Sequence, residues 1–566
     1  MSALSITATG RRPRLSADTP VSEDRATRAT AADQGGMVEE AAAAMPLGWD
    51  AAVVAVYVPA LVVFGAWSSR RQQHAEDYFL ASRGSRWPAI GLALLASNLS
   101  STALVGLAGA AFATGISVYD YEWSAAVVLV FFSTFLLPFL LSSRVYTMPE
   151  FLERRYDARA RIYFALLTLF LNITVDTAAA LYSGSLVTRV LFPGTPLWLV
   201  IGALAGAAGL YTVLGGLRAV IHTEVVQGIV LFLGASAIAV AAFAHAGGWH
   251  AVMTAVPPAK LSLIRPRGDP AVPWPGLLCG IPLLGFYYWC TNQFIVQRML
   301  SARTLEHGRA GALFAGLLKL PVLFLMVLPG TCAIVLFPHL ERADLVYPSL
   351  VFRLLPRGLL GLVAASFAAA TMASVASTLN SASALITMDI VRRSRPSLPE
   401  RHMVRIGRVS TAAMLLVAML WAPQLAHFPS LWQYLQAMLA YAAPPIIALF
   451  LVGLFWPGAT AAGASAALLV GTACGIALFL ANVVFGLVHL HFLYAAPLLV
   501  LIDAAILIGV SCWGAHGSTA PAGVIWTRAY FRAESERLRN VPPWRNYRVQ
   551  GALLLLLTAC VVFVFR

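Results

Sequence analysis

The sequence predicts an all-α polytopic membrane protein with about fourteen transmembrane helices. Of its 566 residues, 59% are hydrophobic and only 11% are charged, which leaves too little polar surface for a water-soluble protein. The mean hydropathy of +0.76 points the same way. Apolar runs of roughly 17–25 residues recur along the chain, and a helix of that length crosses the hydrocarbon core of a bilayer. We therefore expect a multi-pass protein of the cell membrane, in contact with lipid.

Fourteen apolar runs have the length of a membrane span. They cover residues 49–68, 88–112, 119–141, 161–190, 195–214, 223–246, 273–298, 310–337, 358–390, 405–424, 432–455, 460–486, 491–513 and 548–565. Residues 1–46 are rich in Ala, Thr, Arg and Asp without an apolar run, which predicts a disordered tail.

The second run contains a polar segment, Leu94–Gly109. Five of the six residues from Ser97 to Thr102 are Ser, Asn or Thr, and an unbroken helix would turn some of them toward lipid. We expect the helix to break here, because freed carbonyls beside hydroxyls form a natural site for a cation or a substrate. The alternative is an ordinary packed helix whose hydroxyls bond back to carbonyls one turn earlier.

Arginine residues concentrate in the loops that follow odd-numbered runs. These residues are Arg70, Arg71, Arg83 and Arg86 after the first, Arg144, Arg154, Arg155, Arg159 and Arg161 after the third, Arg392, Arg393, Arg395, Arg401, Arg405 and Arg408 after the ninth, and Arg528, Arg532, Arg537, Arg539, Arg545 and Arg548 after the thirteenth. The positive-inside rule makes these loops cytoplasmic, so with fourteen spans both termini are predicted on the outer side. The formal charge of +14 then reflects topology, and we expect no nucleic-acid partner.

Several function classes are excluded by residues that the sequence lacks. Neither of its two lysines follows a glycine, so the chain has no Gly-Lys pair of a phosphate-binding loop. It has no H-E-x-x-H motif and no histidine near the middle of a predicted span, which disfavours an intramembrane metalloenzyme. Residues 514–547, the longest soluble segment after the tail, are too few for a catalytic domain. Transport driven by a gradient, with neither enzymatic activity nor an organic cofactor, is the class that remains.

Charged residues inside the runs mark candidate functional positions, because each costs about 2.5–3.5 kcal/mol on insertion scales. Lys319 lies within the apolar segment FAGLLKLPVLF. It either snorkels toward the cytoplasmic side or donates to a polar substrate or a buried carboxylate, for which Glu122 and Asp176 are candidates. Glu122 and Glu224 each stand near the start of a run, where a helix-capping role is the alternative. Asp503 has no evident partner.

The ninth run carries a stripe of small residues on one helical face. Its members step by three or four positions: Ser366, Ala370, Ser374, Ser377 and Ser381. Small residues let helices pack closely, which is one explanation. The other is that their hydroxyls supply oxygen ligands to a hard cation such as sodium.

Seven blocks of the sequence resemble the sodium/solute symporter family, and within it the sodium/glucose cotransporter branch. In the order of that family they are DYFLASRGSRWPAIGLALLASNLSSTALVGLAG from Asp77, YEW at Tyr121–Trp123, YTMPEFLERRY at Tyr146–Tyr156, YTVLGGLRAVIHTEVVQG at Tyr211–Gly228, YYWCTNQFIVQRML at Tyr287–Leu300, LNSASALITMDI at Leu379–Ile390 and GLFWPGATAAGA at Gly453–Ala464. The resemblance implies two inverted five-helix repeats, about 88–246 and 273–455, with the second and seventh spans broken at the midplane. It places a transporter domain over residues 47–514, a cytoplasmic loop over 515–547 and a last transmembrane helix over 548–566.

The resemblance also implies a sodium site. Its ligands would be the backbone carbonyls of Ala96, Leu99 and Ala370 and the side chains at positions 373 and 374. This chain has Ala373 before Ser374 where the family branch usually has two hydroxyl residues. One side-chain oxygen is therefore missing, and a proton is the alternative coupling ion.

For the substrate, the resemblance implies contacts from polar and aromatic residues, with the aromatic pair as an inner gate. These residues are Asn98, Glu122, Tyr288, Trp289, Lys319 and Gln436. Three positions where sugar-transporting relatives often place a polar contact are apolar here, namely Ala103, Ala125 and Gly285. The function expected is sodium-coupled symport of a sugar or similar small polar solute. The alternatives are a sodium- or proton-coupled symporter of a monocarboxylate or amino acid, and a transporter-like membrane sensor.

Overall fold

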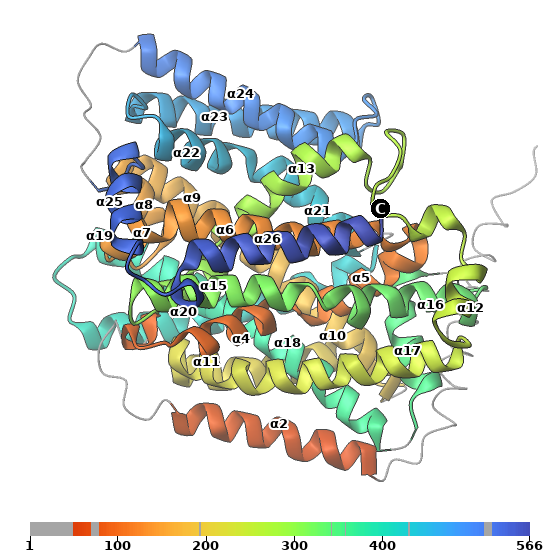
Figure 1. The fold of residues 1–566 in the computed structure, drawn as a ribbon. Helices are drawn as coiled ribbons and strands as arrows, with labels where there is room; N and C mark the ends of the chain where they lie inside the picture. The colour runs from red at the N-terminus through yellow and green to blue at the C-terminus, as the bar shows by residue number, and fades with distance from the viewer. Residues whose placement is uncertain are drawn as a thin grey trace, which may run out of the picture.

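The computed structural model describes residues 49–68, 79–191, 194–340, 342–356, 358–427, 431–513 and 523–566. The predicted tail at 1–46 lies outside these residues, as do Arg70, Arg71 and the first part of the predicted loop at 515–547. The described chain is a bundle of long helices that run roughly side by side (Figure 1).

The helices of the first predicted repeat are α4 (Trp87–Asn98), α5 (Ser101–Thr114), α6 (Asp120–Phe131), α7 (Leu137–Ser142), α9 (Ala158–Leu171), α10 (Ala178–Leu191) and α11 (Leu197–His245). Those of the second are α13 (Trp274–Phe286), α14 (Gln293–Leu300), α15 (Leu305–Lys319), α16 (Leu328–Leu336), α18 (Leu359–Ala384), α20 (Glu400–Trp421), α21 (Leu431–Ala442) and α22 (Pro444–Phe455). Around them lie α2 (Trp49–Ser68), α23 (Ala461–Phe479), α24 (Phe492–Trp513) and α26 (Tyr547–Val564), and short helices α8 (Met148–Arg155), α12 (Gly248–Ala255), α17 (Val346–Leu354), α19 (Arg392–Ser394) and α25 (Arg528–Leu538) complete the set.

All fourteen predicted runs are helical, but their count as spans stays a prediction. In the described part of the chain, nine helical segments are long and apolar enough to cross a membrane, or eleven if each of two bent pairs is one span. The bent pairs are α4 with α5, at 59°, and α21 with α22, at 53°. The predicted break in the second run is confirmed, while the bend in the eleventh was not foreseen.

The predicted loop between the fifth and sixth runs is wrong, because α11 continues through it for 49 residues. A straight helix of that length would measure about 74 Å, more than twice the hydrocarbon thickness of a bilayer. Its apolar stretches Leu197–Leu210 and Leu217–His245 are separate candidates for crossing. Residues 215–222, where the loop was expected, are helical throughout.

Helix α18 is the centre of the bundle. Nearly all its residues are buried, and it carries no charged side chain that would have to face water. A Cβ built on Gly234 of α11 would lie 2.4 Å from Ser366 Oγ, so these two helices approach closely through small residues. The packing explanation of the stripe therefore holds at Ser366.

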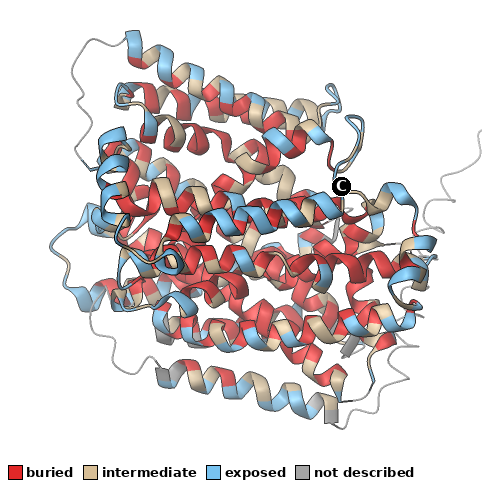
Figure 2. Cartoon of the chain, in the orientation of Figure 1, coloured by how far each residue is buried: buried red, intermediate tan, exposed pale blue. Residues whose placement is uncertain are grey.

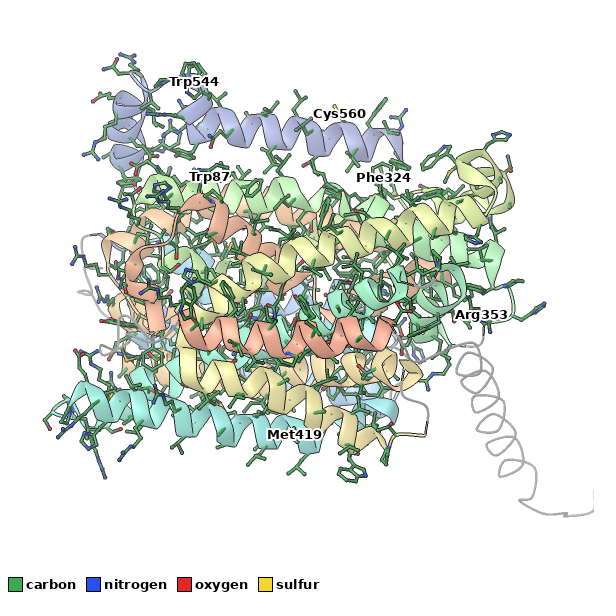
Figure 3. All side chains as sticks on the ribbon, turned by 90° about the horizontal axis from the view of Figure 1, so that it is seen from below. Trp87, Phe324, Arg353, Met419, Trp544 and Cys560 are labelled. Atoms are coloured by element: carbon green, nitrogen blue, oxygen red, sulfur yellow. The ribbon has the colours of Figure 1, made fainter. Side chains whose placement is uncertain are left out.

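The outer helices show the opposite pattern. Helices α2, α24 and α26 carry many exposed residues, whereas the bundle centre is buried (Figure 2). Many of the exposed side chains are apolar, including Val56, Leu469 and Leu501. Met419 of α20 and Cys560 of α26 lie on opposite outer edges of the bundle (Figure 3). Apolar residues around the whole perimeter are typical of a protein that faces lipid.

The arginine-rich segments gather at one end of the bundle. Helices α8, α19 and α25 lie together there, and α12, α17 and the C-terminus lie at the other end (Figure 1). Asp50, near the start of α2, accepts hydrogen bonds from the amides of Gly358 (2.9 Å) and Gly361 (2.7 Å) at the start of α18. The Phe565 carbonyl accepts one from Leu263 (2.8 Å). The two ends of the described chain therefore lie at the same end of the bundle, away from the arginines.

Candidate functional site

The break between α4 and α5 is built by the polar segment that the sequence singles out. Helix α4 ends at Asn98, and Ser100 has an extended backbone (φ −69°, ψ 166°). The Ala103 amide, which would bond the Leu99 carbonyl in a continuous helix, bonds Ser100 Oγ instead at 3.1 Å. Ser101 Oγ donates to the Ala180 carbonyl of α10 at 3.1 Å. The hydroxyls thus cap and anchor α5, and the carbonyls at the end of α4 have no following turn.

A cavity of about 120 Å³ lies beside this break. That volume holds several water molecules or a small solute. Five of the six predicted substrate residues line it: Asn98, Glu122, Tyr288, Trp289 and Gln436. They come from α4, α6, the π-helical turn Tyr287–Thr291 and α21, so the fold brings together residues that are far apart in the sequence.

Lys319, the sixth predicted substrate residue, stands behind Glu122. Its ammonium group forms a buried ion pair with the Glu122 carboxylate and lies 5.4 Å from the centre of the Trp289 ring. The Lys319 side chain is 1% exposed, so the snorkelling interpretation is wrong. Of the two predicted partners, Glu122 rather than Asp176 is the one that it contacts.

Two of the three positions where sugar-transporting relatives often place a polar contact, and which are apolar here, lie at the cavity wall. Ala103 and Gly285 line the cavity, whereas Ala125 is buried without lining it. A Cβ on Gly285 would lie 3.3 Å from Val128, so this glycine also sets the spacing of α13 and α6. Ser124, which the sequence did not single out, supplies a hydroxyl beside them.

The predicted sodium ligands lie where the broken helix meets α18. Helix α18 packs against both α4 and α5. Ala96 and Leu99 lie at the break, and Ala370, Ala373 and Ser374 are buried on α18. Ser374 Oγ donates to the Ala370 carbonyl at 2.9 Å and also lines the cavity. Two carbonyls at a helix break and a carbonyl with its neighbouring hydroxyl are oxygen ligands of the kind that sodium needs.

Glu224 lies elsewhere, in a buried network that the sequence did not predict. It is eight residues into the apolar stretch Leu217–His245, so the capping interpretation is wrong. Arg298 Nε donates to Glu224 Oε2 at 3.0 Å, and neither side chain is exposed. Ser97 and Ser377 also donate to this carboxylate. An arginine inside the predicted seventh span was the signal that should have marked Arg298.

A second unforeseen network closes the arginine-rich end. Asp389 accepts hydrogen bonds from Arg161 Nε (2.6 Å) and Thr147 Oγ1 (2.7 Å). Arg161 and Arg393 both pair with Glu153 of α8. Burial by itself raises the pKa of Glu153, but the hydrogen bonds from the two arginines outweigh it and hold the pKa below its ordinary value.

Asp176 and Asp503, the other two acids that the sequence marks as candidate functional positions inside apolar runs, have no basic partner among the described residues. Asp176 lines the cavity, from the π-helical turn Asn172–Thr177. Asp503 of α24 is fully buried against α23, where a Cβ on Gly471 would collide with its carboxylate, and neither carboxylate oxygen has a hydrogen-bond partner in the described structure.

Comparison with known proteins places this architecture in context. A sequence model of the sodium:solute symporter family matches residues 78–471. Sodium/glucose cotransporter 4 of Danio rerio is 33% identical over 554 residues, which cover 88% of this chain and 83% of the relative. Sodium/myo-inositol cotransporter 2 of Mus musculus is 35% identical, with 79% of this chain and 71% of the relative covered.

Among solved structures, the substrate-bound outward-open state of a Na⁺-coupled sialic acid symporter superposes with a TM-score of 0.74 at 23% identity. The alignment covers 83% of this chain and 98% of that one. At this identity the likeness concerns the fold, and it agrees with the inverted-repeat architecture that the sequence predicts.

Proposed function

The chain belongs to the sodium:solute symporter family, and from that membership we propose that it couples inward sodium movement to the uptake of a sugar. The observation that carries the proposal is the cavity beside the break of α4 and α5. Amide and carboxylate groups bind the hydroxyl edges of a sugar, and aromatic rings cover its apolar faces. The names of the relatives, which include glucose and myo-inositol cotransporters, support the same solute class.

Each cavity residue has a role that follows from its chemistry. Asn98 and Gln436 offer side-chain amide donors and acceptors. The side-chain oxygen of Asn98, Oδ1, has no hydrogen-bond partner among the described residues. Glu122 is an acceptor whose charge Lys319 balances. Tyr288 and Trp289, with ring centres 5.3 Å apart and planes at 76°, present an aromatic corner to the solute. We assign these residues to substrate binding.

The sodium ion would be held by the carbonyls of Ala96, Leu99 and Ala370 with Ser374 Oγ. A single ion that moves down 100 mV supplies about 2.3 kcal/mol, which supports roughly fortyfold accumulation of a neutral solute at about 1.4 kcal/mol per tenfold. These ligands belong to the broken helix and to α18. Sodium binding would therefore stabilise the break between α4 and α5, which also borders the substrate cavity.

The paired state of Lys319 argues against the carboxylate alternative. An anionic solute would need a free cation, but this ammonium group already has an anionic partner inside the protein. A neutral polyol needs only hydrogen bonds, which leave the pair intact. For orientation, we infer that the arginine-rich end of the bundle faces the cytoplasm and that both termini face outward.

Uptake into proteoliposomes tests the function. Radiolabelled glucose, mannose and myo-inositol are offered with an inward sodium gradient, with equal sodium on both sides, and with a proton gradient alone. Accumulation of at least one of them only under the sodium gradient is the expected result. Accumulation of none, or accumulation that follows the proton gradient, would contradict the proposal.

A further inference from the structure

The substrate cavity carries one carboxylate that the protein does not neutralise. Its acidic lining residues are Glu122 and Asp176. Glu122 is paired with Lys319, whereas no described residue forms an ion pair or a hydrogen bond with Asp176. The described cavity lining therefore contains one carboxyl group that no protein side chain pairs with. An unpaired carboxylate at membrane depth is costly, so a bound cation would stabilise it.

The local backbone holds Asp176 in this position. A π-helical turn, Asn172–Thr177, contains it, and such turns are rare and frequently occur at functional sites. The Asn172 amide donates to Ser381 Oγ at 3.3 Å, and the hydroxyls of Thr177 and Thr378 are 2.7 Å apart. These contacts tie the turn to α18 on both sides of Asp176, which keeps its carboxylate beside the cavity.

The surroundings of Asp176 favour an organic cation over a second metal ion. Five aromatic rings line the same cavity: Tyr121, Tyr288, Trp289, Phe294 and Trp432. The Tyr121 and Trp432 rings pack edge to face with centres 5.5 Å apart. A carboxylate together with aromatic faces is typical of ammonium recognition, whereas sodium requires a shell of several oxygens.

We propose that Asp176 binds an ammonium group on the transported solute, so that the preferred substrates are amino sugars or similar cationic polyols. This inference rests on the proposed function, since it names the substrate class of the same site. The Asp176 carboxylate would hold the ammonium group, while Asn98, Glu122 and Gln436 remain for the hydroxyls.

The test compares D-glucosamine with D-glucose and with N-acetyl-D-glucosamine, which removes the charge at the same carbon. Uptake of each into proteoliposomes is measured under a sodium gradient, at a pH that keeps the amine protonated. The wild type should show a kcat/KM for glucosamine at least about tenfold above that for either neutral sugar, as expected for a charge-assisted hydrogen bond. Asp176→Asn should abolish that preference, and Asp176→Glu should retain it.

Asp503→Asn is the matched control, because Asp503 is also an acidic residue of an apolar run without a partner in the described structure, but it does not line the cavity. It should leave the preference unchanged. An equal loss of preference in both variants would overturn the assignment, as would a preference that survives Asp176→Asn. Fewer sodium ions per glucose in Asp176→Asn, with selectivity unaltered, would identify a second sodium ion as the occupant instead. Glucose uptake by a wild type without any ammonium preference refutes this inference alone. Uptake of none of the three sugars also refutes this inference, and it refutes the proposed function as well if mannose and myo-inositol are not accumulated either.

Discussion

Glu224 of α11 and Arg298 of α14 form an ion pair in which neither side chain is exposed. Ser97 of α4 and Ser377 of α18 donate to the same Glu224 carboxylate. The pair therefore joins the last turn of the first broken helix to the central helix and to the segment that follows the interruption at Asn292. Of these elements, α4 and α18 also carry proposed sodium ligands, so the network holds in place the two helices that border that site.

Removing one partner of this pair should destabilise the protein strongly. Arg298→Met and Glu224→Gln are each expected to lower the free energy of unfolding by about 3–5 kcal/mol, because each leaves a polar or charged group buried without its partner. The double variant should lose less than the sum of the two. Denaturant unfolding of the purified protein in detergent micelles measures all three.

Arg154→Gln is the control for that series, since Arg154 pairs with Glu150 while its own side chain is 42% exposed. It should change the free energy of unfolding by no more than about 1 kcal/mol. Single variants of the buried pair that behave like this control would show that Glu224 and Arg298 do not support the fold.

The second ion pair should matter for binding rather than for folding alone. Lys319→Ala is expected to lower the affinity for the solute by about tenfold or more, because Glu122 loses the cation that orients it. Expression should stay near that of the wild type. Equilibrium binding of the labelled sugar to solubilised protein measures the effect.

Glu122→Gln combined with Lys319→Met distinguishes the two roles of this pair. If the residues act together on the solute, the double variant should bind no more weakly than the worse single variant. Unchanged affinity in Lys319→Ala would remove the residue from the substrate site.

Sequence patterns predicted most of the fold but few of the pairings. Apolar runs mark helices by their length, and the polar segment at Ser97–Thr102 marks a break because unsatisfied groups cannot face lipid. The helix through residues 215–222 was missed, because a loop was expected between two successive apolar runs. Side-chain partners such as Lys319 and Glu122 are 197 positions apart, and no local pattern specifies which helices meet.

The site shows the same division. Rarity marked Lys319, because the chain has two lysines and one stands in an apolar run. Arg298 is likewise a charged residue within an apolar run, but it was overlooked because it stands at the end of that run and arginine is common in this chain. The position of Glu224 was misread because its distance from a helix start depends on where α11 begins, and helix boundaries are the least certain part of a sequence prediction.

The orientation in the membrane gives an independent prediction. A reporter that is active only in the cytoplasm should function when it is fused within residues 394–404 or 515–530 and should be silent before residue 45. The physical reason is the excess of arginine in the loops at one end of the bundle. In Figure 3 Trp544 and Arg353 lie at opposite ends, so single-cysteine labelling at these two positions should give opposite accessibility. The reverse pattern would place the arginine-rich end of the bundle outside the cell, and the inferred orientation of the site would be wrong.

The last prediction concerns the ligand that the sodium site lacks. Ala373 is fully buried one residue before Ser374, and a methyl group there supplies no oxygen. Ala373→Ser should restore a ligand and lower the sodium concentration for half-maximal uptake by about fivefold, the effect of roughly 1 kcal/mol. Ser374→Ala should raise that concentration or abolish sodium dependence, because it removes the hydroxyl that remains. Ala376→Ser, on the same helix and equally buried, packs in a different part of the core with Leu181 and Tyr182 and should leave sodium dependence unchanged. Uptake that ignores sodium in the wild type and is unaltered by Ser374→Ala would mean that the site has been abandoned, with a proton as the coupling ion in its place.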